Sequence, residues 1–147
     1  MTIPNHFALG LIIGKITGNY ILATSVSVLL DCDHFIALAK HGKLKDWKTF
    51  WQATTDSEDS FNDQRGFLHT LFSVFLTTTI AYFVFSPAIA FVAGLSHLGH
   101  IFLDTISDSD SWPFRPFSNL KVRGFIPYYS KYEILFFFAL VSIFFLL

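Results

Sequence analysis

Charged residues and cysteine are scarce in this chain of 147 residues. Only 14% of the residues are charged, against roughly 25% in ordinary soluble domains, and the formal net charge is −1. Without a basic excess the chain cannot neutralise a phosphate backbone, so we expect no direct nucleic-acid partner. The single cysteine, Cys32, excludes an intramolecular disulfide, and we predict a buried free thiol there. The first residues lack the basic region of a cleaved signal peptide, so we expect the N-terminus to belong to the mature protein.

Apolar side chains are in excess: 52% of the residues are hydrophobic and nineteen are phenylalanine. They gather in five stretches, at about residues 6–17, 20–31, 67–85, 88–106 and 132–147. At about 1.5 Å per residue the third and fourth stretches are long enough to cross, or nearly cross, a hydrocarbon core of about 30 Å, so they predict a transmembrane hairpin. The first two stretches are shorter and predict a second hairpin, whose depth in the membrane stays open. The last stretch should cross as a fifth helix or lie against the bundle.

These stretches predict an all-α integral membrane bundle of about four to five helices, arranged as antiparallel hairpins within a single domain, residues 1–147. Between the hairpins, the spacing of Leu44, Trp47, Phe50 and Trp51 predicts an amphipathic helix at the lipid interface. The acidic run that follows, Thr54 to Asp63, predicts a solvated loop.

Alternating helix directions place the two long polar segments, 35–66 and 107–131, on the same side of the membrane. Nine of the ten Lys and Arg residues then share that side, with only Lys15 apart. The positive-inside tendency makes that side cytoplasmic.

The same alternation gathers histidines and aspartates at the cytoplasmic end. The residues concerned are His6, Asp31, Asp33, His34, His69, His97, His100 and Asp104. His100 and Asp104, four residues apart, project from one face of a helix, which is how a single helix gives two ligands to one ion. Mixed imidazole and carboxylate donors suit zinc, manganese or iron. A metal ion would also compensate several polar groups that are costly within a membrane segment.

Five further polar positions give less specific predictions. His97 is a ligand or a partner that orients one, and the spacing favours neither. His41 lies in a lysine-rich run and predicts a solvated face, whereas Asp108 and Asp110 predict a loop or cap. Arg65 precedes a helix start, where a guanidinium and helix N-H groups bind a phosphate; the equal alternative is an interfacial arginine facing lipid.

Three motifs occur in order after His6: Leu30-Asp31-Cys32-Asp33-His34, then Gln64-Arg65-Gly66-Phe67-Leu68-His69-Thr70, then Gly99-His100-Ile101-Phe102-Leu103-Asp104 with Trp112-Pro113-Phe114. They resemble the LexA-binding, inner membrane-associated hydrolase family, also described as membrane-bound metal-dependent hydrolases. That family usually has proline where Leu30 stands and histidine where Gln64 stands. It is distantly similar to the zinc-dependent phospholipase C and nuclease group, and this similarity implies phosphodiester hydrolysis.

We therefore expect a membrane-bound metal-dependent hydrolase that acts on a phosphoester of a lipid or lipid-linked substrate at the cytoplasmic face, in the inner membrane if the source is bacterial. One or two divalent ions, first of all zinc, would bind to His6, Asp33, His69, His100 and Asp104. Asp31 and His34 would hold a second ion or act as general base, and Arg65 would hold the substrate anion.

Two alternative functions fit the same residues. A metal transporter or sensor would need ligands spread along a path through the membrane. A membrane scaffold with a structural metal would bind a protein partner through its polar loops, and its coordination sphere would be closed.

Overall fold

The computed structural model describes residues 1–55 and 65–147, and this part of the chain is helical with no strand. Its elements are α1 (Ile3–Thr17), α2 (Tyr20–Leu29), α3 (Cys32–Lys40), α4 (Trp47–Thr55), the 3-10 turn η1 (Phe67–His69), α5 (Leu71–Val84), α6 (Pro87–Ile106) and α7 (Lys131–Leu146). The all-α prediction is confirmed. Thr54 and Thr55, the first residues of the predicted loop, instead end α4. The rest of that loop, residues 56–63, and Gln64 of the second motif fall outside the described residues.

Both predicted hairpins are present, and local sequence explains their turns. Gly18 ends α1 in the left-handed conformation, with φ of 76°, which glycine adopts without steric cost. Asn19 then begins α2 by accepting a hydrogen bond from the N-H of Leu22 at 3.1 Å. In the second hairpin Ser86 caps α6, and Pro87 occupies its first position.

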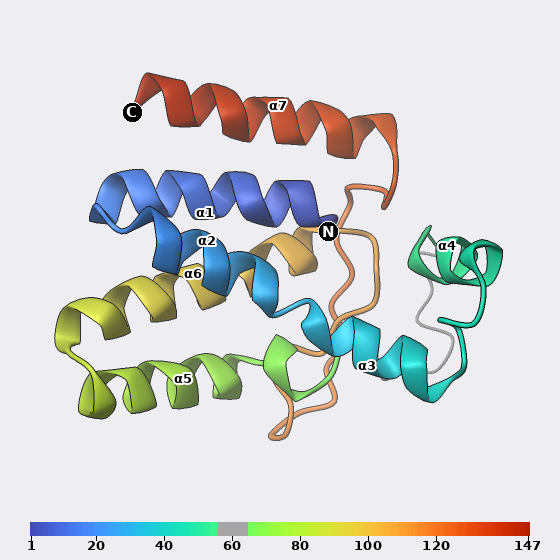
Figure 1. Ribbon diagram of the computed structural model, residues 1–147, viewed down its shortest axis with the longest axis horizontal. Helices are drawn as coiled ribbons and strands as arrows, with labels where there is room; N and C mark the ends of the chain where they lie inside the picture. The colour runs from blue at the N-terminus through green and yellow to red at the C-terminus, as the bar shows by residue number, and fades with distance from the viewer. Residues whose placement is uncertain (56–64) are drawn as a thin grey trace.

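The helices lie side by side with alternating directions (Figure 1). The α1–α2 turn, the α5–α6 turn and the C-terminus gather at one end, and the N-terminus, α3, α4 and the segment after α6 gather at the other. Buried apolar residues hold these helices together: Ile13, Ala23 and Val92 join α1, α2 and α6. The fold thus creates one end made of tight turns and one made of polar segments.

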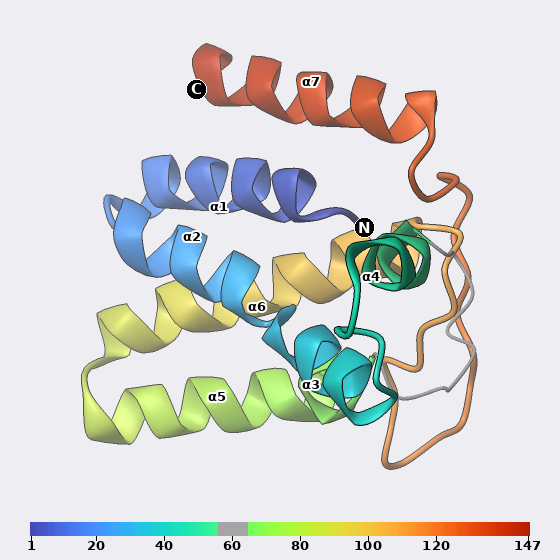
Figure 2. The ribbon, with the colours of Figure 1, turned by 45° about the vertical axis from the view of Figure 1, so that its right-hand side comes forward.

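The last helix, α7, lies against α1 in both ribbon views (Figure 2). Leu140 of α7 packs on Ala8 and Ile12 of α1. At the end of the tight turns, the Nζ of Lys15 donates to the carbonyl of Phe144 at 2.8 Å. The stretch thus packs against the bundle, and its crossing of a membrane as a fifth helix stays a prediction.

In the described part of the chain, two helical runs are long and apolar enough to cross a membrane: Tyr20–Lys40, with 21 residues, and Pro87–Ile106, with 20. This differs from the prediction that the third and fourth stretches form the long pair. The third stretch is shortened because residues 67–69 form η1, which leaves 14 residues in α5. The second stretch is lengthened because the helical path continues from α2 into α3. A bundle of four to five crossing helices therefore stays a prediction.

Candidate metal centre

The histidines and aspartates singled out in the sequence meet at the end of the bundle that holds the polar segments. Two groups of side chains there can each hold a metal ion, because one donor atom from every member lies within 4.8 Å of the others. The first group is His6, Asp31, His100 and Asp104, and the second is Asp31, His34 and His69. Helices far apart in sequence supply these donors, as their alternating directions predict.

The members of the first group are all buried. The Nε2 of His6 lies 3.4 Å from Asp104, and the Nε2 of His100 lies 3.5 Å from Asp31 and 3.6 Å from Asp104. Ligand atoms that each lie about 2.0–2.2 Å from a tetrahedral zinc ion are separated by about 3.3–3.6 Å. These three distances fit one ion, and the 3.9 Å between the Nε2 of His6 and Asp31 would have to shorten by a few tenths of an ångström around it.

The second group shares Asp31 with the first. Its Oδ1 lies 3.7 Å from the Nε2 of His69 and 3.9 Å from the Nε2 of His34. His34 is the most exposed member, with 27% of its side chain accessible. Within residues 1–55 and 65–147 the second group offers three protein donors, one fewer than a closed four-coordinate zinc site uses.

Asp31 occupies this shared position because α2 ends at Leu29 and α3 begins at Cys32. The two turn residues between the helices direct the Asp31 carboxylate into the bundle. Cys32, one residue further along, is exposed. The predicted buried thiol is therefore wrong, since neighbouring helical positions point about 100° apart.

Asp33 lies in neither group. Its Oδ2 is 3.1 Å from the Nδ1 of His69, which leaves the Nε2 of that ring to face the shared carboxylate. His100 is oriented in a similar way, because its Nδ1 donates to the carbonyl of Ser27 at 2.7 Å. Such partners fix the ring and make the other nitrogen a better ligand. Because the partner of His100 is a backbone carbonyl, no side-chain pattern in the sequence indicates Ser27.

His97 also lies outside both groups. Its Nε2 donates to the carbonyl of Leu68 at 2.7 Å and lies 3.2 Å from the hydroxyl of Ser73. It therefore holds the turn that carries His69, which is an orienting role. His41 ends α3 outside both groups, and Asp108 accepts the N-H of Tyr128 at 2.8 Å, as expected of a loop residue.

Arg65 enters the centre from the start of η1. Its Nε lies 3.6 Å from the Oδ2 of Asp104, and its Nη1 donates to the carbonyl of Asp110 at 2.9 Å. The carboxylate of Asp104 also accepts a hydrogen bond from the amino group of Met1. Several buried polar atoms here lack a hydrogen-bond partner among the described residues: Asp31 Oδ2, His34 Nε2, Arg65 Nε and Asp104 Oδ2. Because unpaired buried polar atoms are costly, a cation and an anion bound here would stabilise them.

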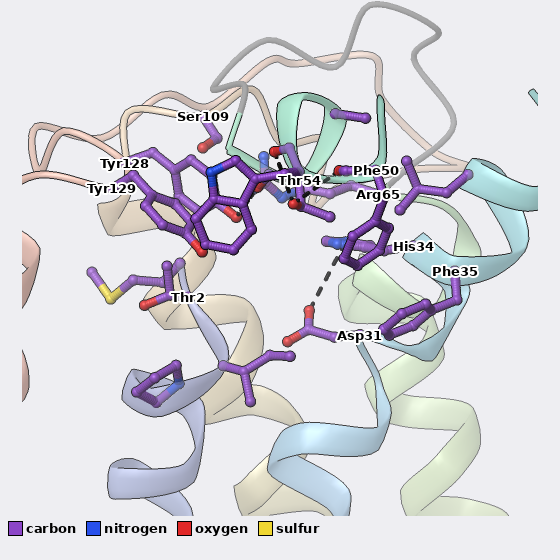
Figure 3. Close-up of a pocket in the computed structure, with 16 residues that line it drawn as sticks. Thr2, Asp31, His34, Phe35, Phe50, Thr54, Arg65, Ser109, Tyr128 and Tyr129 are labelled. Carbon is purple, nitrogen blue, oxygen red and sulfur yellow. Dashed lines mark hydrogen bonds and ion pairs between the residues drawn. The ribbon is translucent and has the colours of Figure 1, made fainter. Parts of the chain in front are cut away.

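Next to the centre lies a cavity of about 300 Å³. Figure 3 shows Asp31 and His34 facing each other at its edge, with Tyr128 and Tyr129 on another side. Aromatic and aliphatic side chains from α3 and α4 form much of the wall, namely Phe35, Leu38, Phe50 and Trp51. Burial raises the pKa of the Tyr128 phenol, which donates to the carbonyl of Thr54 at 3.0 Å and so attaches α4 to this wall.

The protonation of His69 gives the centre a pH dependence. Burial on its own would lower the pKa of His69, but the carboxylates of Asp31 and Asp33 raise it to about 9. A metal ligand needs a neutral imidazole nitrogen, so an ion that binds here displaces a proton at neutral pH. We expect the apparent zinc affinity to rise about tenfold per pH unit from about pH 7 and to level off above about pH 9.

Competition against a chromophoric zinc chelator, corrected for the chelator's own protonation, measures this dependence. Titrations in two buffers with different ionisation enthalpies count the protons released. An affinity that stays flat from neutral pH to about pH 9 would contradict the role of His69.

No protein family, curated protein or solved structure compared with this chain matches it.

Proposed function

We propose that this chain is a membrane-bound metal-dependent hydrolase that cleaves a phosphoester of a lipid or a lipid-linked molecule at the cytoplasmic membrane face. The observation that carries the proposal is the pair of donor groups sharing Asp31, with Arg65 and a cavity beside them. The motif resemblance points to the same chemistry. Such a centre could accept many phosphoesters. The apolar wall of the cavity favours those with a hydrocarbon part.

In this proposal His6, Asp31, His100 and Asp104 hold one ion, and His34 and His69 hold a second through the shared Asp31. Asp31 then takes the ligand role that the sequence suggested for Asp33, and Asp33 orients His69 instead of binding metal. A bound divalent ion supplies Lewis acidity, which activates water and polarises the phosphoryl oxygen.

Side chains of the protein bind the substrate anion and take part in proton transfer. Arg65 binds the phosphate oxygens, and its guanidinium is already held in place by the Asp110 carbonyl. Water forms the new bond to phosphorus, the ester oxygen leaves with the bonding electrons, and a proton passes from the water to the leaving alcohol. If one ion is bound instead of two, His34 is free to receive that proton as general base.

The apolar wall of the cavity supports a substrate with a hydrocarbon part. Phe35 and Trp51 are each 47% exposed there, and Trp47 on the outer side of α4 is 72% exposed. Aromatic side chains of this kind suit the headgroup zone of a membrane. A phosphoester carried at the membrane surface would reach the cavity without leaving the lipid phase.

The gathering of donors supports hydrolysis over transport. Within residues 1–55 and 65–147, the histidines and carboxylates of both groups lie at one end of the helices, and the far end carries Lys15. A transport path would need ligands along its length. Metal flux in proteoliposomes would favour the transporter, and a co-purifying protein with a closed coordination sphere would favour the scaffold.

Two measurements on detergent-purified protein test the proposal. We expect elemental analysis to find two zinc, manganese or iron ions per chain, and a panel of lipid and soluble phosphoesters to show hydrolysis that a chelator abolishes and the metal restores. Full metal content with no hydrolysis of any panel member would contradict the function while leaving the metal centre intact. Protein that binds no metal would contradict both.

A further inference from the structure

A second hollow lies between the start of α5 and the irregular segment after α6, and we call it the α5 groove. It has a volume of about 680 Å³, and its lining is apolar except for Arg115 and Ser118. The N-H of Leu71 donates to the carbonyl of Pro113 at 2.8 Å, and the rings of Phe72 and Phe117 meet edge-on at 5.6 Å. These contacts tie the two walls together, so the fold itself forms the groove.

The apolar lining of the α5 groove is open to the surroundings. Phe75 is 66% exposed, Phe117 is 81% exposed and Leu120 is 59% exposed. Further along α5, Ile80 and Phe83 are also exposed, at 51% and 80%. Exposed apolar surface of this kind marks an interaction site, and α5 packs against α6, which is long and apolar enough to cross a membrane. Hydrocarbon is therefore the partner that this surface fits.

Among the described residues, Arg115 supplies the one positive charge of the groove lining. Its guanidinium lies 4.7 Å from the ring centre of Trp112 and, within residues 1–55 and 65–147, forms no ion pair with a carboxylate. The cations further along the same segment differ, because Lys121 and Arg123 both face Asp110. An arginine held on an aromatic ring, with its donors directed to no carboxylate, is suited to a phosphate.

We propose that the α5 groove binds an anionic phospholipid, with an acyl chain along Phe72, Phe75 and Phe117 and the phosphate at Arg115. Charge complementarity favours this occupant over a second copy of the chain, whose groove would bring another Arg115 and no anion. The site does not depend on hydrolysis, and the lipid that it holds is bound and not consumed. Since η1 directly precedes α5, the headgroup would lie at the same end of the bundle as the metal centre.

Quenching of Trp112 fluorescence by lipids with brominated acyl chains tests this site. The variant Trp47→Phe with Trp51→Phe leaves Trp112 as the single tryptophan. In detergent with EDTA, which stops any metal-dependent reaction, we expect saturable quenching by brominated phosphatidylglycerol, with affinity about fivefold higher than for brominated phosphatidylcholine. Arg115→Gln in this background should reduce the affinity for phosphatidylglycerol to that for phosphatidylcholine. Phe75→Ser with Phe117→Ser should lower the affinity for both lipids.

The matched control is Arg123→Gln, which removes a cation of the same segment outside the groove lining and should change neither affinity. Equal affinities for the two lipids in the parent protein would overturn the proposal, as would an Arg115→Gln variant that keeps the preference. Displacement of phosphatidylglycerol by inorganic phosphate would instead identify a free-phosphate site. A dimer in light scattering whose formation excludes the lipid would show that a second copy covers the groove.

Discussion

The double substitution His100→Ala with Asp104→Ala is expected to strip the metal from the protein and to abolish hydrolysis. Both residues come from α6, and together they supply half of the donors of the first group. Because loss of a partner that only orients a ligand costs about 10–100-fold in metal affinity, loss of two ligands should cost more than about 100-fold. Elemental analysis of the detergent-purified variant measures the effect directly.

A matched control is His41→Ala with Asp46→Ala, which removes the same residue types outside both groups and should keep the full metal content. Circular dichroism reports whether each variant retains its helices. Because the double variant loses buried groups, Asp104→Asn is a second test that keeps the side-chain volume and should also lower metal content. Unchanged metal in a folded double variant would mean that the first group is not a metal site.

Arg65→Ala is expected to leave metal content unchanged and to lower kcat/KM by about 100-fold to 1,000-fold, the range measured when one donor to a developing oxyanion is removed. The guanidinium lies next to Asp104 but is not a metal donor, and the ion would then neutralise this carboxylate on its own. Arg65→Lys should recover part of the rate, because it keeps the charge without the fork of donors.

Separate kcat and KM values show where Arg65 acts. A rise in KM alone would mean that Arg65 binds the substrate anion and the transition state equally well. The control for charge loss at this end of the molecule is Lys121→Ala, which removes an exposed cation that pairs with Asp110. If Arg65→Ala lost its metal, or if it hydrolysed phosphoesters at the parent rate, the proposed role would be wrong.

The meeting of distant histidines was predictable because its cause is local. Gly18-Asn19 and Ser86-Pro87 reverse the chain at fixed positions, and reversals place His6 and His69 at the end where His100 emerges. Nothing more than helix direction is needed for that result. The all-α fold follows from the same apolar periodicity.

The division of roles between Asp31 and Asp33 was not predictable, because it depends on where α2 gives way to α3. A shift of the break by one residue would rotate each carboxylate by about 100°, so that neither would keep its present direction. The sequence placed Asp33 among the first ligands and gave Asp31 the role of second-ion ligand or general base. Only the packed structure shows which carboxylate faces both groups.

The length of α5 also could not be predicted from the local sequence. Residues 67–85 form one apolar run, yet the carbonyl of Leu68 is taken by His97 and Ser73, and the N-H of Leu71 bonds to Pro113. These tertiary hydrogen bonds divert the backbone groups that would otherwise extend the helix. The run therefore divides into η1 and α5, and a predicted long span becomes a short helix.

Because the first donor group takes residues from α1, the α2–α3 junction and α6, no isolated segment of the chain contains it. A nascent hairpin could offer at most two of those donors, with weak affinity for any ion. Metal binding must then follow the docking of the hairpins. The bound ion stabilises only molecules whose hairpins have assembled correctly. The rate at which the protein acquires metal should accordingly report how fast its hairpins come together.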